Sequence, residues 1–172
     1  IRDGAVQVRD YGRGIPHGAV VDCVSKINTG AKYSEGAFSK TVGLNGVGTK
    51  AVNALSTEFR IESFREGQVK AARFSLGVLE DDEAVTATSL RNGTRTSFKP
   101  DPSVFKSYQY RREYVERLLW NYAYLNSGLT LVFNGEKIHS EDGLKDLIKQ
   151  NLSAESGYPI IHLKGAEIEV AL

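Results

Sequence analysis

Three glycines, at positions 43, 46 and 48, stand directly before a helical pattern of apolar residues that runs to Ser56. Glycine allows the backbone to approach a ligand closely and to adopt positive φ angles. The first turn of the helix that follows carries free N–H groups and the positive end of the helix dipole. This combination predicts an anion site, most often one for phosphate. For this stretch alone, a flexible loop before a core helix is an equally weighted alternative, because short motifs also match by chance.

A second loop that could bind a ligand follows a short strand, which the alternating residues 5–9 predict. The loop has the pattern D-x-G-x-G and runs through Asp10, Gly12, Gly14, Ile15 and Pro16. Glycines two residues apart predict a tight turn at the end of a strand. Without other motifs, a surface turn with a solvated aspartate is the better interpretation.

The residues between the two loops form two different segments. Residues 19–27 carry an apolar stripe at helical spacing. Residues 28–41 are polar, contain Lys32 and Lys40, and lead into the glycine loop. Loops of this length are usually functional or disordered, so we expect a lid over a phosphate site, with both lysines as candidate phosphate partners. Taken singly, each lysine is equally well explained as a solvated side chain.

The rest of the chain predicts the fold. Short β-type runs at residues 59–64, 69–76, 85–89 and 94–98 are separated by turn signals and predict an antiparallel meander, in which sequence neighbours pair. Residues 65–68 predict a hairpin turn between the first two runs. Apolar residues at helical spacing predict helices at 19–27, 46–56 and 109–126. We therefore expect an α+β fold, a two-layer sandwich with a mixed, mainly antiparallel sheet and helices on one face.

Composition narrows the classes of function. The 172 residues include 22 basic and 21 acidic side chains, so the overall charge does not favour nucleic acid. The single cysteine, Cys23, excludes an internal disulfide and fits a reducing compartment. The three histidines have no partner at metal-ligand spacing, so we predict no zinc site. No apolar run reaches membrane-spanning length, and a start at Ile1 without any Met predicts a processed or truncated chain.

Asp10 to Pro16, followed by residues 43–56, resembles the signature of the GHKL, or Bergerat-fold, ATPases. Within that superfamily the sequence is most similar to the B subunit of bacterial type IIA topoisomerases. The motifs that carry this resemblance occur in the family's order and cover nearly the whole chain: R-G-I-P at 13–16, T-G-A-K-Y at 29–33, G-L-N-G-V-G at 43–48, V-N-A-L-S at 52–56, N-G-T at 92–94 and L-N-S-G at 125–128. The short segment after Pro16 favours a topoisomerase IV B subunit or a compact gyrase B subunit.

The resemblance implies a role in ATP binding for each matching residue. The buried carboxylate of Asp10 accepts the adenine amino group and excludes guanine, whose keto oxygen would meet a second acceptor. Thr94 assists this recognition, and the adenine slot is formed by the loop of Gly12, Gly14, Ile15 and Pro16. The phosphates are bound by Lys32 and by the backbone N–H groups of Gly43, Leu44, Asn45, Gly46, Val47 and Gly48. The rim of the pocket, where inhibitors of the family bind, is marked by Arg13 and Arg65.

The resemblance also implies what residues 1–172 lack. The family's catalytic glutamate and magnesium-binding asparagine lie on a helix before the strand that leads to Asp10. We therefore expect no catalytic or metal-binding residue in the chain and a general base upstream of Ile1. The chain alone is expected to hydrolyse no ATP, because hydrolysis needs a base and a cation. Residues 1–152 are expected to form the ATP-binding domain without its N-terminal strand and helix, and residues 153–172 to begin the transducer domain.

For the intact protein, the resemblance implies a cytoplasmic, ATP-hydrolysing DNA topoisomerase with ATP and Mg²⁺ as cofactors. ATP binding would close a homodimer of B subunits and drive DNA strand passage together with the A subunit, without a membrane partner. Two alternatives stay open. One is another GHKL ATPase of the mismatch-repair, chaperone or histidine kinase type, against which the V-N-A-L-S motif argues. The other is a nucleotide- or inhibitor-binding module without turnover.

Overall fold

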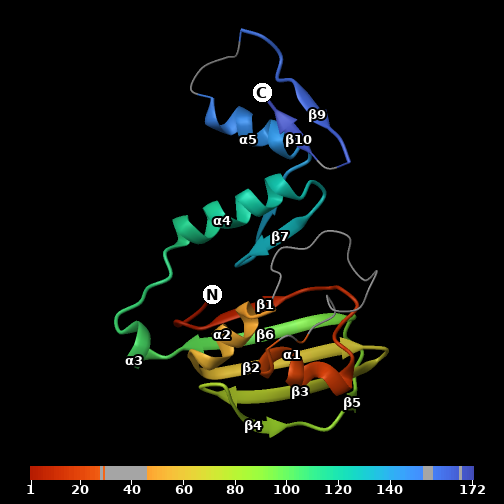
Figure 1. The fold of residues 1–172 in the computed structure, drawn as a ribbon, viewed down its shortest axis with the longest axis vertical. Coiled ribbons are helices and arrows are strands. Elements are labelled where there is room, and N and C mark those ends of the chain that lie inside the picture. Colours follow the sequence, from red (N-terminus) through yellow and green to blue (C-terminus); the bar gives the residue numbers. More distant parts are fainter. Residues whose placement is uncertain (28, 30–45, 153–156, 167) are drawn as a thin grey trace. The chain divides into compact units, whose positions relative to one another are not determined.

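The computed structural model describes residues 1–27, 29, 46–152, 157–166 and 168–172 (Figure 1). These residues form two compact units, residues 1–109 and residues 110–172. The predicted lid, with Lys32 and Lys40, lies outside the described residues except for Thr29. The candidate site residues that the structure describes all belong to the first unit.

The first unit is built on an antiparallel sheet with the strand order β1-β6-β2-β3-β4, in which β5 pairs with β3. Its strands are β1 (Val6–Arg9), β2 (Ser56–Arg65), β3 (Gln68–Ser75), β4 (Val78–Asp82), β5 (Thr86–Ala87) and β6 (Gly93–Pro100). The predicted meander is confirmed for β2, β3 and β5, because β3 pairs with each of the other two. The prediction that sequence neighbours pair is wrong for β6, which returns to pair with β2 and β1. This return places Phe98 opposite Phe59, so that an apolar side chain of β6 packs against the core.

The turn between β2 and β3 is the one that the sequence predicted at residues 65–68. Its two central residues, Glu66 and Gly67, have φ angles of 55° and 73°. Positive φ at both positions is the requirement of the two-residue hairpin turn that matches the twist of the strands. The turn thereby fixes the register in which Phe59 of β2 faces Phe74 of β3.

Strand β4 was not predicted, because its sequence passes into an acidic run instead of alternating. In the structure this run is paired with basic residues of the neighbouring strand. Asp81 contacts Arg73 at 2.5 Å and Asp82 contacts Lys70 at 2.5 Å. Contacts between strands therefore define β4, and a reading of local periodicity alone does not find it.

Two short helices cover one face of this sheet (Figure 1). They are α1 (Val20–Ser25), which follows a 3-10 turn (His17–Ala19), and α2 (Gly48–Ala54), and both lie within the predicted ranges. The side chain of Asn53 links them, because its Nδ2 donates to the Val24 carbonyl at 3.0 Å. The core between helices and sheet consists of Val20, Val24, Phe59, Ile61, Ala72 and Phe74. The predicted α+β class, a mainly antiparallel sheet with helices on one face, is confirmed.

The third predicted helix is α4 (Arg112–Leu125), which belongs to the second unit. The other elements of this unit are β7 (Thr130–Phe133), β8 (Glu136–His139), α5 (Leu144–Asn151), β9 (His162–Lys164) and β10 (Glu169–Ala171). Strands β7 and β8 form a hairpin through Asn134 and Gly135, whose φ angles are 47° and 95°.

A further short helix of the first unit, α3 (Pro102–Phe105), was not predicted. Asp101 caps its N-terminus, because the Asp101 carboxylate accepts a hydrogen bond from the Ser103 N–H at 2.8 Å.

Candidate functional site

Asp10 lies in the loop that follows β1, and its carboxylate is held by backbone and side-chain donors. Its Oδ1 accepts a hydrogen bond from the Gly12 N–H at 2.9 Å. Its Oδ2 accepts one from the Thr94 N–H at 3.1 Å and another from the Thr94 hydroxyl. The Asp10 N–H in turn donates to the Thr94 carbonyl at 3.0 Å. The structure therefore brings together Asp10, Gly12 and Thr94, three residues that the sequence assigned to one site.

The environment of this carboxylate differs from the expectation in one respect. Asp10 is exposed, so the prediction of a buried carboxylate is wrong for this structure. The physical reason is that Asp10 lies one residue beyond β1 (Val6–Arg9), in a loop outside the core. Its hydrogen bonds orient the carboxylate, and an ionised carboxylate has lone pairs for about four donors. It therefore retains acceptor capacity for a ligand.

Gly93 makes the contact between Asp10 and β6 sterically possible. Its φ is +130°, and a Cβ at this position would lie 2.1 Å from the Asp10 carbonyl oxygen. A side chain of any size would push the two backbones apart. The glycine of the N-G-T motif is thus required by the close approach of the chain segments that carry Asp10 and Thr94.

The next part of the loop, Gly14 to Pro16, is fixed against β2. Gly14 has a φ of +75°, and a Cβ there would lie 2.5 Å from the Phe64 carbonyl oxygen. The Ser63 hydroxyl accepts a hydrogen bond from the Ile15 N–H at 2.8 Å and donates one to the Ile15 carbonyl at 2.7 Å. Ser63 has no exposed surface. It is therefore a second anchor of this loop, beside the Asp10–Thr94 contact.

Sequence reasoning missed Ser63. A usable signal was present, because Phe59, Ile61 and Ser63 occupy alternate positions of β2 and therefore face the same side of the sheet. A polar residue that continues a core-facing alternation must find a partner, since an unpaired buried polar group is costly. The alternation would have indicated that something polar docks at Ser63, but not that the partner is Ile15.

Of the two predicted rim residues, Arg13 directly precedes this loop in the sequence, and Arg65 lies close to it in space. Arg13 is exposed, and the Cβ of Arg65 lies 3.3 Å from the position that a Cβ on Gly14 would occupy. The Arg65 Nε donates to Glu66 at 2.8 Å, and the Glu66 N–H donates to the Asn92 side-chain oxygen at 3.1 Å. Arg65 therefore lies beside the loop, on a turn that is tied to the N-G-T segment.

The phosphate part of the predicted site is described only from Gly46 onward. Lys32, Gly43, Leu44 and Asn45 lie outside the described residues. Gly46 has a φ of +58°, and Val47 is the residue directly before α2, which begins at Gly48. Val52 of α2 and Ile15 of the Asp10 loop both pack against the same core cluster. The two glycine loops thus approach one hydrophobic core from different parts of the sequence.

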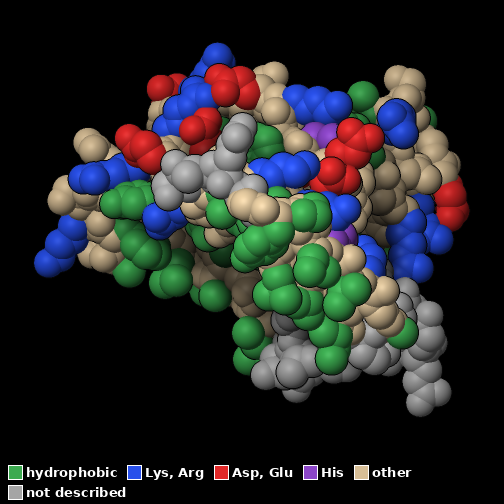
Figure 2. Space-filling model, turned by 90° about the horizontal axis from the view of Figure 1, so that it is seen from above, with side chains coloured by type: hydrophobic (Ala, Val, Ile, Leu, Met, Phe, Trp, Pro, Cys, Tyr) green, Lys and Arg blue, Asp and Glu red, His purple; other side chains and the backbone are tan. Residues whose placement is uncertain are grey.

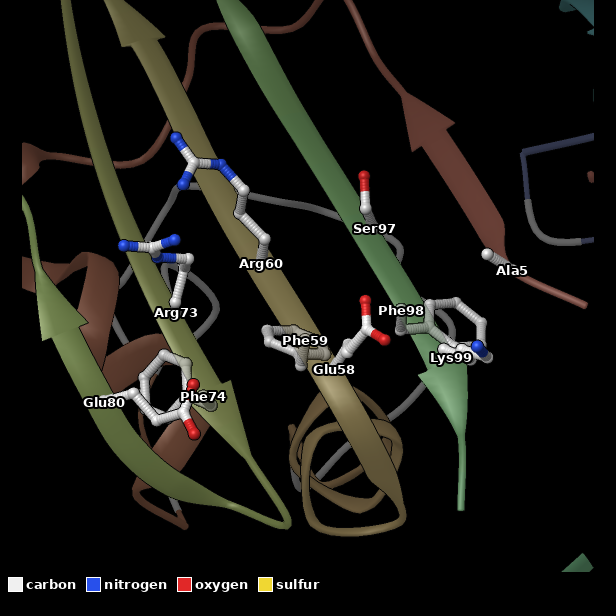
Figure 3. Close-up of a pocket in the computed structure, with 10 residues that line it drawn as sticks. All are labelled: Ala5, Glu58, Phe59, Arg60, Arg73, Phe74, Glu80, Ser97, Phe98 and Lys99. Atoms are coloured by element: carbon white, nitrogen blue, oxygen red, sulfur yellow. The ribbon is translucent and has the colours of Figure 1, made fainter. Parts of the chain in front are cut away.

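The other face of the sheet is charged, because its side chains alternate with those of the core. Glu62 accepts hydrogen bonds from Arg95 at 2.5 Å and 2.7 Å, which hold the pKa of the Glu62 carboxyl below its ordinary value. A hollow of about 360 Å³ lies over β2, β3 and β6. Figure 3 shows residues that line it, among them Arg60, Arg73 and Ser97. None of the predicted site residues lines this hollow, so it is not part of the candidate site. Figure 2 shows another side of the molecule, seen from above, on which Lys and Arg side chains lie among Asp and Glu side chains.

Comparisons with known proteins show which sequences are related to the chain. No family model matches the chain. The chain is 40% identical over 167 residues to the B subunit of DNA topoisomerase 4 from Borreliella burgdorferi, covering 96% of this chain and 28% of that protein. It is 36% identical over 154 residues to the B subunit of DNA gyrase from Thermus thermophilus, covering 84% of this chain and 24% of that protein.

A solved structure shows the same fold. It is the 43K ATPase domain of Thermus thermophilus gyrase B in complex with an aminocoumarin, with a TM-score of 0.78 and 29% sequence identity over 99% of this chain and 48% of that one. The sheet, its helical face and the Asp10 loop define a GHKL ATPase domain. The chain belongs to the B subunits of type IIA topoisomerases and corresponds to part of their ATPase domain. It spans about a quarter of the length of the curated relatives named above. None of the described helices has the length and hydropathy needed to cross a membrane.

Proposed function

We propose that the Asp10 loop and the Gly46–Gly48 segment bind the adenine and the phosphates of ATP. The observation that carries the proposal is the Asp10 carboxylate, which Gly12 and Thr94 hold in one orientation at the end of β1. An acceptor-only group in a fixed position accepts the amino group of adenine and repels the keto oxygen of guanine. Gly14, Ile15 and Pro16 form the adjoining wall of the slot.

The phosphates are assigned to the glycine loop before α2. The glycines at 46 and 48 let the backbone come close to a ligand, and the proposal includes Gly43, Leu44, Asn45 and Lys32 on the strength of the resemblance. Arg13 and Arg65 are proposed to contact inhibitors at the rim. A relative of known structure was solved with an aminocoumarin, which supports inhibitor binding by this chain as part of the same proposal.

For the whole protein we propose ATP-driven strand passage of DNA, with closure of a homodimer of B subunits and cooperation with the A subunit. The names of the relatives support this role. Mg²⁺ is the metal that the resemblance implies. The described residues contain no group of three or more His, Cys, Asp or Glu side chains that could hold a metal ion, and we assign no step to it. We also propose that the protein is cytoplasmic and that residues 153–172 begin the transducer domain.

Replacement of Asp10 tests the adenine site. In the full-length protein, Asp10→Ala should weaken ATP binding by about 1.5–3 kcal/mol, the range for hydrogen bonds to charged groups. That is roughly a ten- to hundredfold loss of affinity, measured by isothermal titration calorimetry. The matched control is Asp22→Ala on α1, which removes an exposed ion pair with Lys26 at 2.9 Å. Its ATP affinity should equal that of the wild type.

A second measurement tests the orientation argument. The wild type should prefer ATP over GTP, and Asp10→Asn should reduce this preference, because an amide offers a donor as well as an acceptor. Circular dichroism establishes that each variant is folded. Unchanged ATP affinity in a folded Asp10→Ala protein would show that Asp10 is only a turn residue.

A further inference from the structure

The ammonium group of Lys50 lies where the two ends of the segment 30–45 meet. Lys50 belongs to α2, is half-buried, and donates from Nζ to the Thr29 carbonyl at 3.0 Å. A Cβ on Gly46 would lie 3.4 Å from this Nζ and 3.1 Å from the Thr29 carbonyl oxygen. The positive charge of Lys50 is therefore beside the first described residue of the glycine loop.

The position of Thr29 is fixed independently of Lys50. The Thr29 hydroxyl contacts the carbonyl oxygens of Asp22 at 2.7 Å and of Lys26 at 2.6 Å, at the C-terminal end of α1. The Thr29 carbonyl is thus anchored to a helix of the core. It offers Lys50 one fixed acceptor, which holds the lysine side chain against the glycine loop.

The ammonium group of Lys50 has no anionic partner within the described ranges of the chain. No carboxylate there lies within 4 Å of it, and the partner that it does have, the Thr29 carbonyl, is neutral. The neighbouring thiol of Cys23 does not supply a negative charge at neutral pH, because burial raises its pKa. A lysine has three donors, and among the described residues the structure shows one acceptor for Lys50, the Thr29 carbonyl.

We propose that Lys50 is a phosphate ligand of the nucleotide site, in addition to Lys32. The inference rests on the proposed ATP site. It assigns to Lys50 the positive charge that contacts the phosphates from the side of α2. A half-buried ammonium group with a neutral partner attracts an anion more strongly than an exposed lysine does, because water and salt screen it less. The alternative is that Lys50 only ties the Thr29 carbonyl to Gly46 and contacts no ligand.

Three substitutions separate the two roles. Lys50→Gln keeps a donor for the Thr29 carbonyl but removes the charge, and Lys50→Arg keeps the charge. Lys26→Gln is the matched control, because Lys26 lies near the same junction, is exposed and pairs with Asp22. Binding of adenosine, ADP and ATP to the full-length variants is measured by calorimetry. Adenosine reports on the adenine slot alone, whereas ADP and ATP also report on the phosphates.

We expect Lys50→Gln to bind adenosine like the wild type and to bind ATP about ten- to a hundredfold more weakly. Lys50→Arg should recover most of the loss, and Lys26→Gln should change nothing. Wild-type ATP affinity in Lys50→Gln, or an equal loss for adenosine and ATP, would overturn the proposal. These outcomes are distinct from a failure of the ATP site itself, in which the wild type would bind neither ligand or Asp10→Ala would have no effect.

A measurement on the unmodified protein covers the case in which a variant does not fold. Acetic anhydride acetylates accessible lysines, and mass spectrometry reports the rate at each one. ATP should slow the acetylation of Lys50 several-fold, adenosine should not, and Lys26 should react equally with both. Equal acetylation of Lys50 in the presence of ATP and of adenosine would contradict a contact with phosphate.

Discussion

Removal of the Ser63 hydroxyl should loosen the Gly14–Pro16 loop and weaken nucleotide binding. Ser63→Ala deletes both hydrogen bonds to Ile15, at 2.8 Å and 2.7 Å, from a side chain with no exposed surface. A neutral hydrogen bond contributes about 0.5–1.5 kcal/mol to stability, so the two together contribute about 1–3 kcal/mol. Alanine is nearly isosteric with serine here, so the change tests the hydrogen bonds and not the packing.

Part of the stability lost in Ser63→Ala should also be lost from the free energy of ATP binding. If the loop is no longer held by Ser63, ATP must order it on binding, which lowers the apparent affinity. A share of about 1.4 kcal/mol corresponds to a tenfold weaker affinity. Both effects are measurable on the same preparation, by urea unfolding with an unchanged m-value and by calorimetric titration with ATP.

The matched control for this experiment is Ser97→Ala on β6. Ser97 accepts one exposed hydrogen bond from Gln7 at 3.2 Å, so its loss should change stability by less than about 0.5 kcal/mol. If Ser63→Ala matches the wild type in both its urea midpoint and its ATP affinity, the Ile15 contacts do not hold the loop, and this account of the slot is wrong.

Two other predictions concern the first unit. Gly93→Ala should destabilise the protein by more than about 3 kcal/mol in urea unfolding, because its Cβ would lie 2.1 Å from the Asp10 carbonyl oxygen. Gly67→Ala is the matched control, because a Cβ at Gly67 would have no atom within 4 Å although φ is +73°. It should lower the free energy of unfolding by about 1–2 kcal/mol. Equal destabilisation by Gly93→Ala and Gly67→Ala would contradict the steric argument. The hydrogen bond from Arg95 lowers the pKa of Glu62 in the folded state. The Glu62–Arg95 pair therefore stabilises the folded protein fully at pH values above the pKa that Glu62 has in the unfolded chain. This stabilisation is lost as the pH falls through the pKa of Glu62 in the folded protein. Unfolding of Glu62→Gln between about pH 2.5 and 6 should therefore depend less on pH than unfolding of the wild type, and parallel curves would refute this role.

The sequence contained enough local information to predict much of the fold, and the errors arose where distant contacts decide. The turn at residues 65–68 is specified by its own residues, and the structure has it with positive φ at Glu66 and Gly67. The pairing of β6 with β2 and β1 is decided by packing, since the fit of Phe98 to Phe59 is invisible in local periodicity. Helices 19–27 and 46–56 are shorter than predicted, because an apolar stripe does not mark the last hydrogen bond of a helix.

The same distinction holds for the candidate site. Asp10 and Thr94 were assigned to one site through the resemblance, and the structure places them in hydrogen-bond contact. Ser63 and Lys50 were missed, because each acts on a backbone group that lies 48 or 21 residues away in the sequence. No pattern of spacing identifies such partners. Their roles in ATP binding stay predictions until the substitutions described above are measured.

The double hydrogen bond between Ser63 and Ile15 has a consequence for the chemistry of inhibitors. Because the Ile15 N–H already donates to Ser63, a compound in the slot finds no free backbone donor at Ile15, and the Ile15 carbonyl already accepts one hydrogen bond from the same hydroxyl. Affinity there should come from shape, apolar contact and the Asp10 carboxylate. Resistance to a compound that binds Asp10 would require a substitution of Asp10, the residue that is proposed to bind adenine. Such a substitution would weaken the binding of ATP as well as the binding of the compound.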